Sequence, residues 1–313
     1  MSLRNLLVAL FTLVVSLSAS AFMPAGGLWV VNNEVDGKPG RGFTIEVENE
    51  IMVFTYYGYR HDGTAVFYQA AGSVTNNMFS AGLQEYAGGT VLGGSTTDAH
   101  VTGGPGTVSM TFYSGLNGTI TLPGESPKAI AKFEFGYSTD PRSLLGTWLM
   151  VVPALGTVVG NYETLTTVGV ASSTGTGTVV NAARNFVCES QISGAAAGDI
   201  ICSQVPLQAG AMMYGFRMAG DRGEGQGGAW DAASGSHAFI LRTATASGAG
   251  TGVNDGLDAQ LMPGALRAVR RLNAVPPGAT AASPAAPDQL SQGEWQALQA
   301  WSQEVTLMPA VLH

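Results

Sequence analysis

The chain has 313 residues, of which 43 are glycine and 12% are charged, and its formal net charge is −8. This acidic balance disfavours nucleic acid and anionic membranes as partners, because both are held chiefly by Lys and Arg. Glycine adopts positive φ without steric cost but weakens helices, so the composition predicts short strands joined by tight turns in an all-β fold.

The first 21 residues have the parts of a secretory signal peptide. Arg4 is followed by an apolar run from Leu6 to Leu17 and then by the small residues Ala19 to Ala21, after which we expect cleavage. The apolar run is shorter than the roughly 18 residues that a membrane-spanning helix needs. We therefore expect an exported protein, periplasmic or extracellular, with no transmembrane segment in the mature chain.

Residues 22–140 alternate apolar and polar side chains over short stretches, a pattern typical of half-buried strands. Phe43, Ile45 and Val47 share one face of such a stretch, while Glu46 and Glu48 share the other. Short turns between the stretches indicate antiparallel hairpins. We expect eight strands, at 28–31, 43–47, 51–59, 64–72, 77–86, 107–113, 118–122 and 129–136. This series predicts an up-and-down β-barrel, with a β-sandwich as the alternative.

Two glycine-rich stretches interrupt the expected strands. The first, at 87–106, contains Asp98 and His100, and we expect a mobile loop there, with a functional flap as the alternative. The second, at 220–228, carries Asp221, Arg222 and Glu224. We expect a plain turn there, with an anion-binding nest of backbone N–H groups as the alternative.

Residues 141–246 are expected to form a second β-rich unit. Gly146 and Trp148 repeat the Gly-x-Trp opening that Gly27 and Trp29 make in the first unit. Strand-like stretches follow at 148–152, 162–170, 185–190, 199–204, 212–218 and 237–243.

Cys188 and Cys202, both in this second unit, are the only cysteines of the chain. In an exported protein two cysteines predict a disulfide, worth about 3 kcal/mol for a loop of this length on the chain-entropy model. There is no CxxC motif and no His nearby in the sequence, so we expect neither a metal site nor an activated thiol at these cysteines.

The last part of the chain changes character. Residues 247–290 are expected to be irregular and to include a Pro- and Ala-rich linker, and 291–305 to form an amphipathic helix. Ser291 and Glu294 make a capping box, and Trp295, Leu298 and Trp301 fall near helical spacing. A helix this short is marginal alone, so these three residues must dock, either on the protein's own barrel or on a partner protein.

A pattern of glycine and aromatic residues in the first unit resembles a known family. The pattern consists of Gly27-Leu28-Trp29, Gly40-Arg41-Gly42-Phe43-Thr44-Ile45-Glu46, Tyr57-Gly58-Tyr59, and Gly63 before Phe67, Tyr68 and Gly72. It is similar to an uncharacterised bacterial exported β-domain family, in which Trp usually stands where this chain has Phe67. The resemblance implies a β-domain in the cell envelope, and because the family has no established activity, no catalytic residue can be carried over from it. The Gly-x-Trp opening also resembles lipocalin- and avidin-type barrels.

No group of residues forms a recognisable catalytic motif. The four histidines are not spaced as metal ligands, and neither HExxH nor GxSxG occurs. We therefore expect no catalytic residue, no metal and no cofactor. The candidate ligand-binding residues are aromatic side chains on adjacent expected strands, although such clusters also form cores. They are Tyr56, Tyr57, Tyr59, Phe67 and Tyr68.

Three functions follow as hypotheses. The first is a non-enzymatic binding module whose barrel holds a small apolar or aromatic ligand. The second is a structural or adhesive cell-surface protein whose C-terminal helix docks on another surface protein. The third, a hydrolase of the envelope, is disfavoured by the missing motifs.

Overall fold

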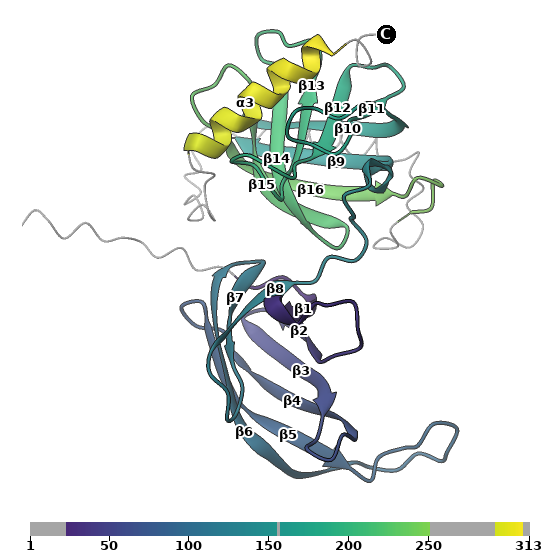
Figure 1. Cartoon of the computed structure of the whole chain (residues 1–313), viewed down its shortest axis with the longest axis vertical. Coiled ribbons are helices and arrows are strands. Elements are labelled where there is room, and N and C mark those ends of the chain that lie inside the picture. The colour runs from purple at the N-terminus through teal and green to yellow at the C-terminus, as the bar shows by residue number, and fades with distance from the viewer. Residues whose placement is uncertain (1–22, 155–156, 251–291, 309–313) are drawn as a thin grey trace, which may run out of the picture.

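The computed structural model describes residues 23–154, 157–250 and 292–308. Two closed antiparallel β-barrels of eight strands each follow one another along the chain, and a helix lies on the second (Figure 1). The all-β prediction is confirmed, and the first unit is a barrel and not a sandwich. The expected signal peptide at 1–21 and most of the expected linker at 247–290 lie outside the described residues.

The first barrel has an up-and-down order, in which each strand pairs with the next. Its strands are β1 (Gly27–Val31), β2 (Gly42–Glu48), β3 (Ile51–Tyr59), β4 (Ala65–Ser73), β5 (Met78–Ala87), β6 (His100–Ser114), β7 (Asn117–Thr121) and β8 (Lys128–Lys132). β8 pairs back onto β1, with Val30 opposite Ala131, and this closure leaves no unpaired edge strand. All eight strands overlap the expected stretches, although β6 begins seven residues before the expected start and β8 ends four residues before the expected end.

Large apolar side chains fill the interior of the first barrel. Phe43 of β2 and Met52 and Phe54 of β3 face inward and are at most 1% exposed. Trp29 of β1 is fully buried and meets Phe112 of β6 edge to face, with ring centroids 5.7 Å apart. A barrel of eight strands is just wide enough for side chains to fill it, and this one has a packed core.

The two ends of the first barrel are built differently. At one end, β2–β3 and β4–β5 are joined by tight turns in which Asn49 and Asn76 have φ values of 45° and 51°. Asparagine tolerates this left-handed conformation better than most residues do. Longer loops at 32–41, 60–64, 88–99 and 122–127 lie at the other end, which we call the loop end.

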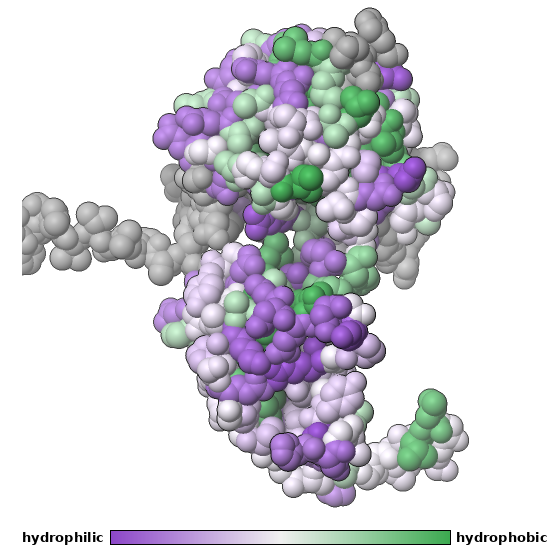
Figure 2. Space-filling view, viewed as in Figure 1, coloured by the Kyte–Doolittle hydropathy of each residue, from purple (hydrophilic) through white to green (hydrophobic). Residues whose placement is uncertain are grey.

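The prediction of a loop at 87–106 is wrong for its second half. β6 begins at His100, and its first residues pair with the end of β5. Every residue from His100 to Thr107 is exposed, so the two strands form a ribbon that extends beyond the barrel core. Val91 and Leu92 in the connecting loop are 69% and 106% exposed, and Figure 2 shows an apolar tip on this protruding hairpin.

The second barrel also has eight strands. They are β9 (Gly146–Ala154), β10 (Thr157–Val168), β11 (Val179–Asn181), β12 (Phe186–Ser190), β13 (Ile200–Gln204), β14 (Met212–Ala219), β15 (Arg222–Ala229) and β16 (Ser236–Ala244). β9 pairs with both β10 and β16 and closes the barrel. The sequence patterns predict six of these strands but miss β11 and β15.

The expected turn at 220–228 is wrong, because most of this stretch is strand β15. The inward positions of β15 are glycines that lie opposite bulky residues of β14; Gly227, for example, is paired with Tyr214. A Cβ atom at Gly227 would lie 2.6 Å from Cδ1 of Tyr214. Glycine therefore makes room in this strand for the large side chains of its neighbour.

Cys188 and Cys202 form a disulfide, as predicted. They lie directly opposite each other on β12 and β13. Both are at most 1% exposed and belong to the core of the second barrel. The bond therefore joins neighbouring strands from inside the barrel.

The helix α3 (Gln292–Leu307) covers part of the outer wall of the second barrel, against β13 and β14. Its buried face is formed by Trp295, Leu298, Trp301 and Val305, which pack against outward-facing residues such as Ile201. No helix in the described ranges is long and apolar enough to cross a membrane.

The two barrels open in the same way. Trp29 and Trp148 are both buried, and each indole N–H donates to the carbonyl oxygen four residues earlier at 2.9 Å. Each indole also contacts a phenylalanine on the sixth strand of its barrel, Phe112 or Phe216. The Gly-x-Trp repeat noticed in the sequence thus marks equivalent positions in two copies of one architecture.

Candidate functional site

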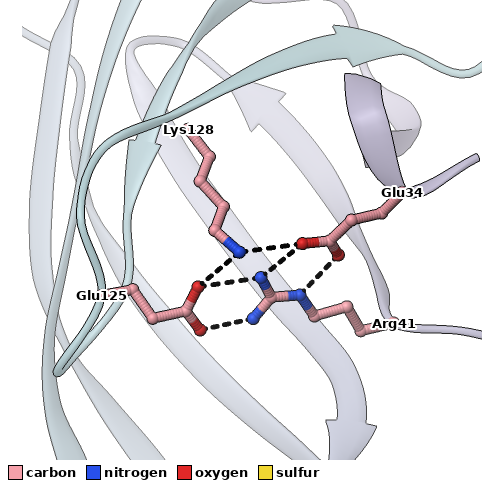
Figure 3. Close-up of polar contacts among 4 residues, drawn as sticks. All are labelled: Glu34, Arg41, Glu125 and Lys128. Carbon is pink, nitrogen blue, oxygen red and sulfur yellow. Dashed lines mark hydrogen bonds and ion pairs between the residues drawn. The ribbon is translucent and has the colours of Figure 1, made fainter.

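Four charged residues form a compact cluster at the loop end of the first barrel (Figure 3). Glu34 ends the short helix η1 (Asn32–Glu34), and Arg41 immediately precedes β2. Glu125 lies in the loop between β7 and β8, and Lys128 begins β8. The cluster therefore joins segments of the loop end that are far apart in the sequence.

Arg41 lies at the centre of this cluster. Its Nε donates to Oε2 of Glu34 at 2.7 Å, and its Nη2 donates to Oε2 of Glu125 at 2.8 Å. Lys128 bridges the same two carboxylates, with its Nζ 2.9 Å from Glu34 and 3.0 Å from Glu125. Two cations balance two anions, and charge-assisted hydrogen bonds of this kind are among the stronger ones in proteins.

The cluster is suited to holding loops together and not to proton transfer. Hydrogen bonds from Arg41, with a smaller contribution from Lys128, lower the pKa of Glu34 and of Glu125 to about 2. Both carboxylates are therefore ionised at neutral pH, and neither has a proton to donate as a general acid.

The five aromatic residues expected to bind a ligand lie on adjacent strands but on two different faces. Tyr56 and Tyr68 pack against the core at the loop end, directly opposite each other, with ring centroids 5.9 Å apart. Tyr57 and Tyr59 of β3 and Phe67 of β4 point outward. The split follows from the alternation of side chains along a strand.

The outward group forms an exposed aromatic surface. Tyr57, Tyr59 and Phe67 are 48%, 54% and 47% exposed, and Tyr57 lies directly opposite Phe67. The Phe67 ring is nearly parallel to that of Tyr86 on β5, at 12°, with centroids 6.4 Å apart. We call Tyr57, Phe67 and Tyr86, which cross three neighbouring strands, the aromatic row.

An open hollow of about 370 Å³ lies at the loop-end side of the aromatic row. It is lined by Gly40, Tyr57, Gly58, Tyr59, Ala65, Val66 and Phe67. Apart from the three aromatic residues, these side chains are small or absent. The hollow therefore lies against the exposed rings of Tyr57, Tyr59 and Phe67.

Sequence reasoning missed a row of polar side chains beside the aromatic row. Thr55 of β3 lies opposite Gln69 of β4, and Gln69 lies opposite Gln84 of β5. Each is two residues from a member of the aromatic row, so both rows lie on the same outer face. We call Thr55, Gln69 and Gln84 the polar row. Reading every second residue outward from Tyr57 and Phe67 would have found two of its members.

Hydrogen bonds order the side chains of this face. The Tyr86 hydroxyl donates to Oε1 of Gln84 at 2.8 Å, and Nε2 of Gln69 donates to Oγ1 of Thr55 at 3.4 Å. None of the six side chains in the two rows is charged. The two rows together present aromatic rings beside neutral donors and acceptors.

The helix residues expected to dock lie on the protein's own second barrel. Trp295, Leu298 and Trp301 are at most 3% exposed there, and Nε1 of Trp301 donates to Glu189 at 2.7 Å. A role for these three residues in binding a partner stays a prediction. In the part of the chain that the structure describes, no group of three or more His, Cys, Asp or Glu residues is placed to hold a metal ion.

No protein-family model matches the chain, and no match is found among curated proteins or solved structures. The resemblance to bacterial exported β-domains and the likeness of the Gly-x-Trp opening to lipocalins and avidins therefore stay predictions. Only the geometry of the two barrels bears on function.

Proposed function

We propose that the protein is an exported, non-enzymatic binding module that holds its ligand on the outer face of β3, β4 and β5. The observation that carries this proposal is the set of large aromatic side chains that lie about half exposed on these strands, Tyr57, Tyr59 and Phe67. Contiguous exposed aromatic residues are uncommon away from binding surfaces, where their broad, rigid faces supply contact area.

The packing of the barrel favours this outer face over the interior as the ligand site. Side chains such as Phe54, Phe79 and Met110 already fill the interior and are at most 2% exposed. A ligand inside the barrel would have to displace a close-packed core, which is energetically costly. We therefore propose that the small ligand suggested by the barrel fold binds outside the barrel, on the aromatic row.

Two features support export. Residues 1–21 read as a signal peptide. The Cys188–Cys202 disulfide is of the kind that persists in oxidising compartments, such as the bacterial periplasm or the extracellular space. A binding surface that faces the envelope or the surroundings of the cell fits such a location.

The two alternatives have less support. An adhesive scaffold that docks through α3 would need the apolar face of the helix, and that face is buried on the second barrel. A hydrolase would need a proton donor or a nucleophile with its base. At the loop end, the clustered carboxylates Glu34 and Glu125 are instead neutralised by Arg41 and Lys128.

The double variant Tyr57→Ser/Phe67→Ser tests the proposed surface. We expect the wild-type protein to sediment with the insoluble envelope fraction of its host and the double variant to bind about tenfold more weakly or worse, because two of the three half-exposed rings are lost. Tyr113→Ser is the matched control, since Tyr113 is 62% exposed on β6, away from the two rows. Equal binding by the double variant would rule the surface out, and turnover of an ester, glycoside or peptide would favour the hydrolase.

A further inference from the structure

The two rows on β3, β4 and β5 together indicate a class of ligand. We infer that the face binds a neutral polysaccharide, with sugar rings lying on the aromatic row and hydroxyl groups meeting the polar row. This inference rests on the proposed function of the same face and names its ligand class.

The aromatic row matches the apolar side of a sugar chain. A pyranose ring carries C–H groups on its faces and hydroxyl groups around its edge, so its face packs on the negative face of an aromatic ring. Tyr57, Phe67 and Tyr86 stand on strands that lie about 4.8 Å apart. A chain that crosses the strands meets these rings one after another, and the Phe67 and Tyr86 rings, nearly parallel at 12° with centroids 6.4 Å apart, hold each other in place.

The polar row matches the hydroxyl groups of the same chain. A glutamine amide offers two donors and an acceptor, and a threonine hydroxyl offers a donor and two lone pairs. Sugar hydroxyls both donate and accept, so Gln69, Gln84 and Thr55 complement them without any charge. Gln84 is exposed, and the other two are partly exposed, so a ligand on the aromatic row can reach all three.

The lack of positive charge in the two rows disfavours acidic ligands. Arg60 and Glu85, at the loop end, form an ion pair with each other at 2.5 Å. The next outward positions beyond the polar row are the small uncharged residues Val53, Ala71 and Gly82. Nothing in the two rows supplies the cation that a phosphate or carboxylate group would need.

The shape of the apolar surface disfavours a folded protein as the ligand. A stable protein–protein interface buries at least about 1,000 Å² in total, with an apolar centre and a polar rim. Here the aromatic surface is a band only one or two residues deep, and the polar row borders it directly. Such a band fits a narrow, extended ligand.

Binding to defined neutral glycans tests the inference. We would measure depletion of the full chain on insoluble cellulose and chitin, and titrate soluble cello- and chito-oligosaccharides by calorimetry. At least one of these should bind, with affinity nearly unchanged between about 50 and 500 mM NaCl because no charges are involved. A proline-rich peptide and an anionic polysaccharide serve as the competing ligand classes.

Single variants distinguish ring stacking from general loss of structure. Tyr57→Ala and Phe67→Ala should each weaken glycan binding about tenfold. Tyr57→Phe should keep most of the affinity, because the ring remains. Gln69→Leu, which keeps the volume but removes the amide, should weaken binding several-fold, and Tyr113→Ala should have no effect. Melting temperatures of all the variants would show that each one folds.

The outcomes separate this inference from the proposed function. If envelope binding depends on the aromatic row but no neutral glycan binds, or if the peptide binds instead, the ligand class is wrong and the binding surface stands. If envelope binding does not depend on the aromatic row, both are wrong. Glycan binding that Tyr57→Ala and Phe67→Ala leave unchanged would also overturn the inference.

Discussion

Arg41 is the residue on which the loop end of the first barrel most depends. Its side chain is 18% exposed and bonds two carboxylates that come from different loops. Isolated surface ion pairs contribute little to stability, but a partly buried network built on a planar guanidinium contributes more. Lysine at this position would keep the charge and lose the geometry that lets one side chain bond both Glu34 and Glu125.

The same network predicts how the stability of the first barrel depends on pH. The folded-state pKa of Glu34 and of Glu125 is about 2, below the ordinary value of 4.5, so the unfolded chain binds more protons between these two values. Their contribution to the free energy of unfolding is therefore fully present above about pH 4.5 and is lost as the pH falls towards 2.

Glu34→Gln measures this dependence. The variant should melt at a lower temperature than the wild type at pH 7, because it loses its ionic bonds to Arg41 and Lys128. The difference should shrink as the pH approaches 2.5, as followed by differential scanning calorimetry. Glu48→Gln is the control, since Glu48 is exposed on the outer face of β2. A melting-temperature difference that is the same at pH 7 and near pH 2.5 would contradict the lowered pKa of Glu34.

At the scale of elements, α3 is held by both apolar and polar contacts. Leu298 fits against Gly215 of β14, where a Cβ atom would lie 2.5 Å from Cδ2 of the leucine. Glu189 of β12 is fully buried and accepts hydrogen bonds from the indole of Trp301 and from the backbone N–H groups of Ser172 and Gly177. The helix thus covers and hydrogen-bonds a carboxylate that would otherwise be exposed on the outer wall of the barrel.

Leu298→Ala should destabilise the second barrel by about 2–5 kcal/mol, because it leaves a cavity between α3 and β14. Chemical denaturation would measure the loss of stability, and hydrogen exchange of the native protein would show that it falls on strands β13 and β14. The control is Gln296→Ala, which lies on the exposed side of the same helix. Unchanged stability in Leu298→Ala would mean that the helix contributes little to the barrel.

The elements differ in how far the sequence predicts them. The first barrel follows from simple alternation, since residues such as Phe43 and Phe54 occupy the inward positions that the pattern marks. The pattern does not predict β15, because the inward positions of this strand are glycines. Glycine is needed there because the bulky side chains of Tyr214 and Phe216 on the neighbouring strand β14 leave no room for a Cβ atom. Likewise, the aromatic row depends on the pairing of β4 with β5, which places Tyr86 beside Phe67. Such pairings are long-range contacts that no local pattern contains.

At the scale of the whole molecule, each barrel has its own hydrophobic core, and this determines how the protein unfolds. The core around Trp29 contains only residues of the first barrel, and the core around Trp148 contains only residues of the second barrel and the segment that leads into it. That segment is fastened to the second barrel by Tyr137, whose hydroxyl donates to Asp221 at 2.8 Å and whose ring lies under Arg242. The barrels are therefore expected to unfold as separate cooperative units.

The disulfide tests this independence, because it lies in the second core alone. Calorimetry of the oxidised protein should resolve two transitions. Cys188→Ala/Cys202→Ala should lower one of them by about 3 kcal/mol, or roughly 10–20 °C, since the unfolded second barrel regains the entropy of an open loop. The other transition should stay where it was and should respond to Glu34→Gln instead. If both variants shifted one common transition, the two cores would be coupled, and the aromatic surface of the first barrel would depend on the stability of the second.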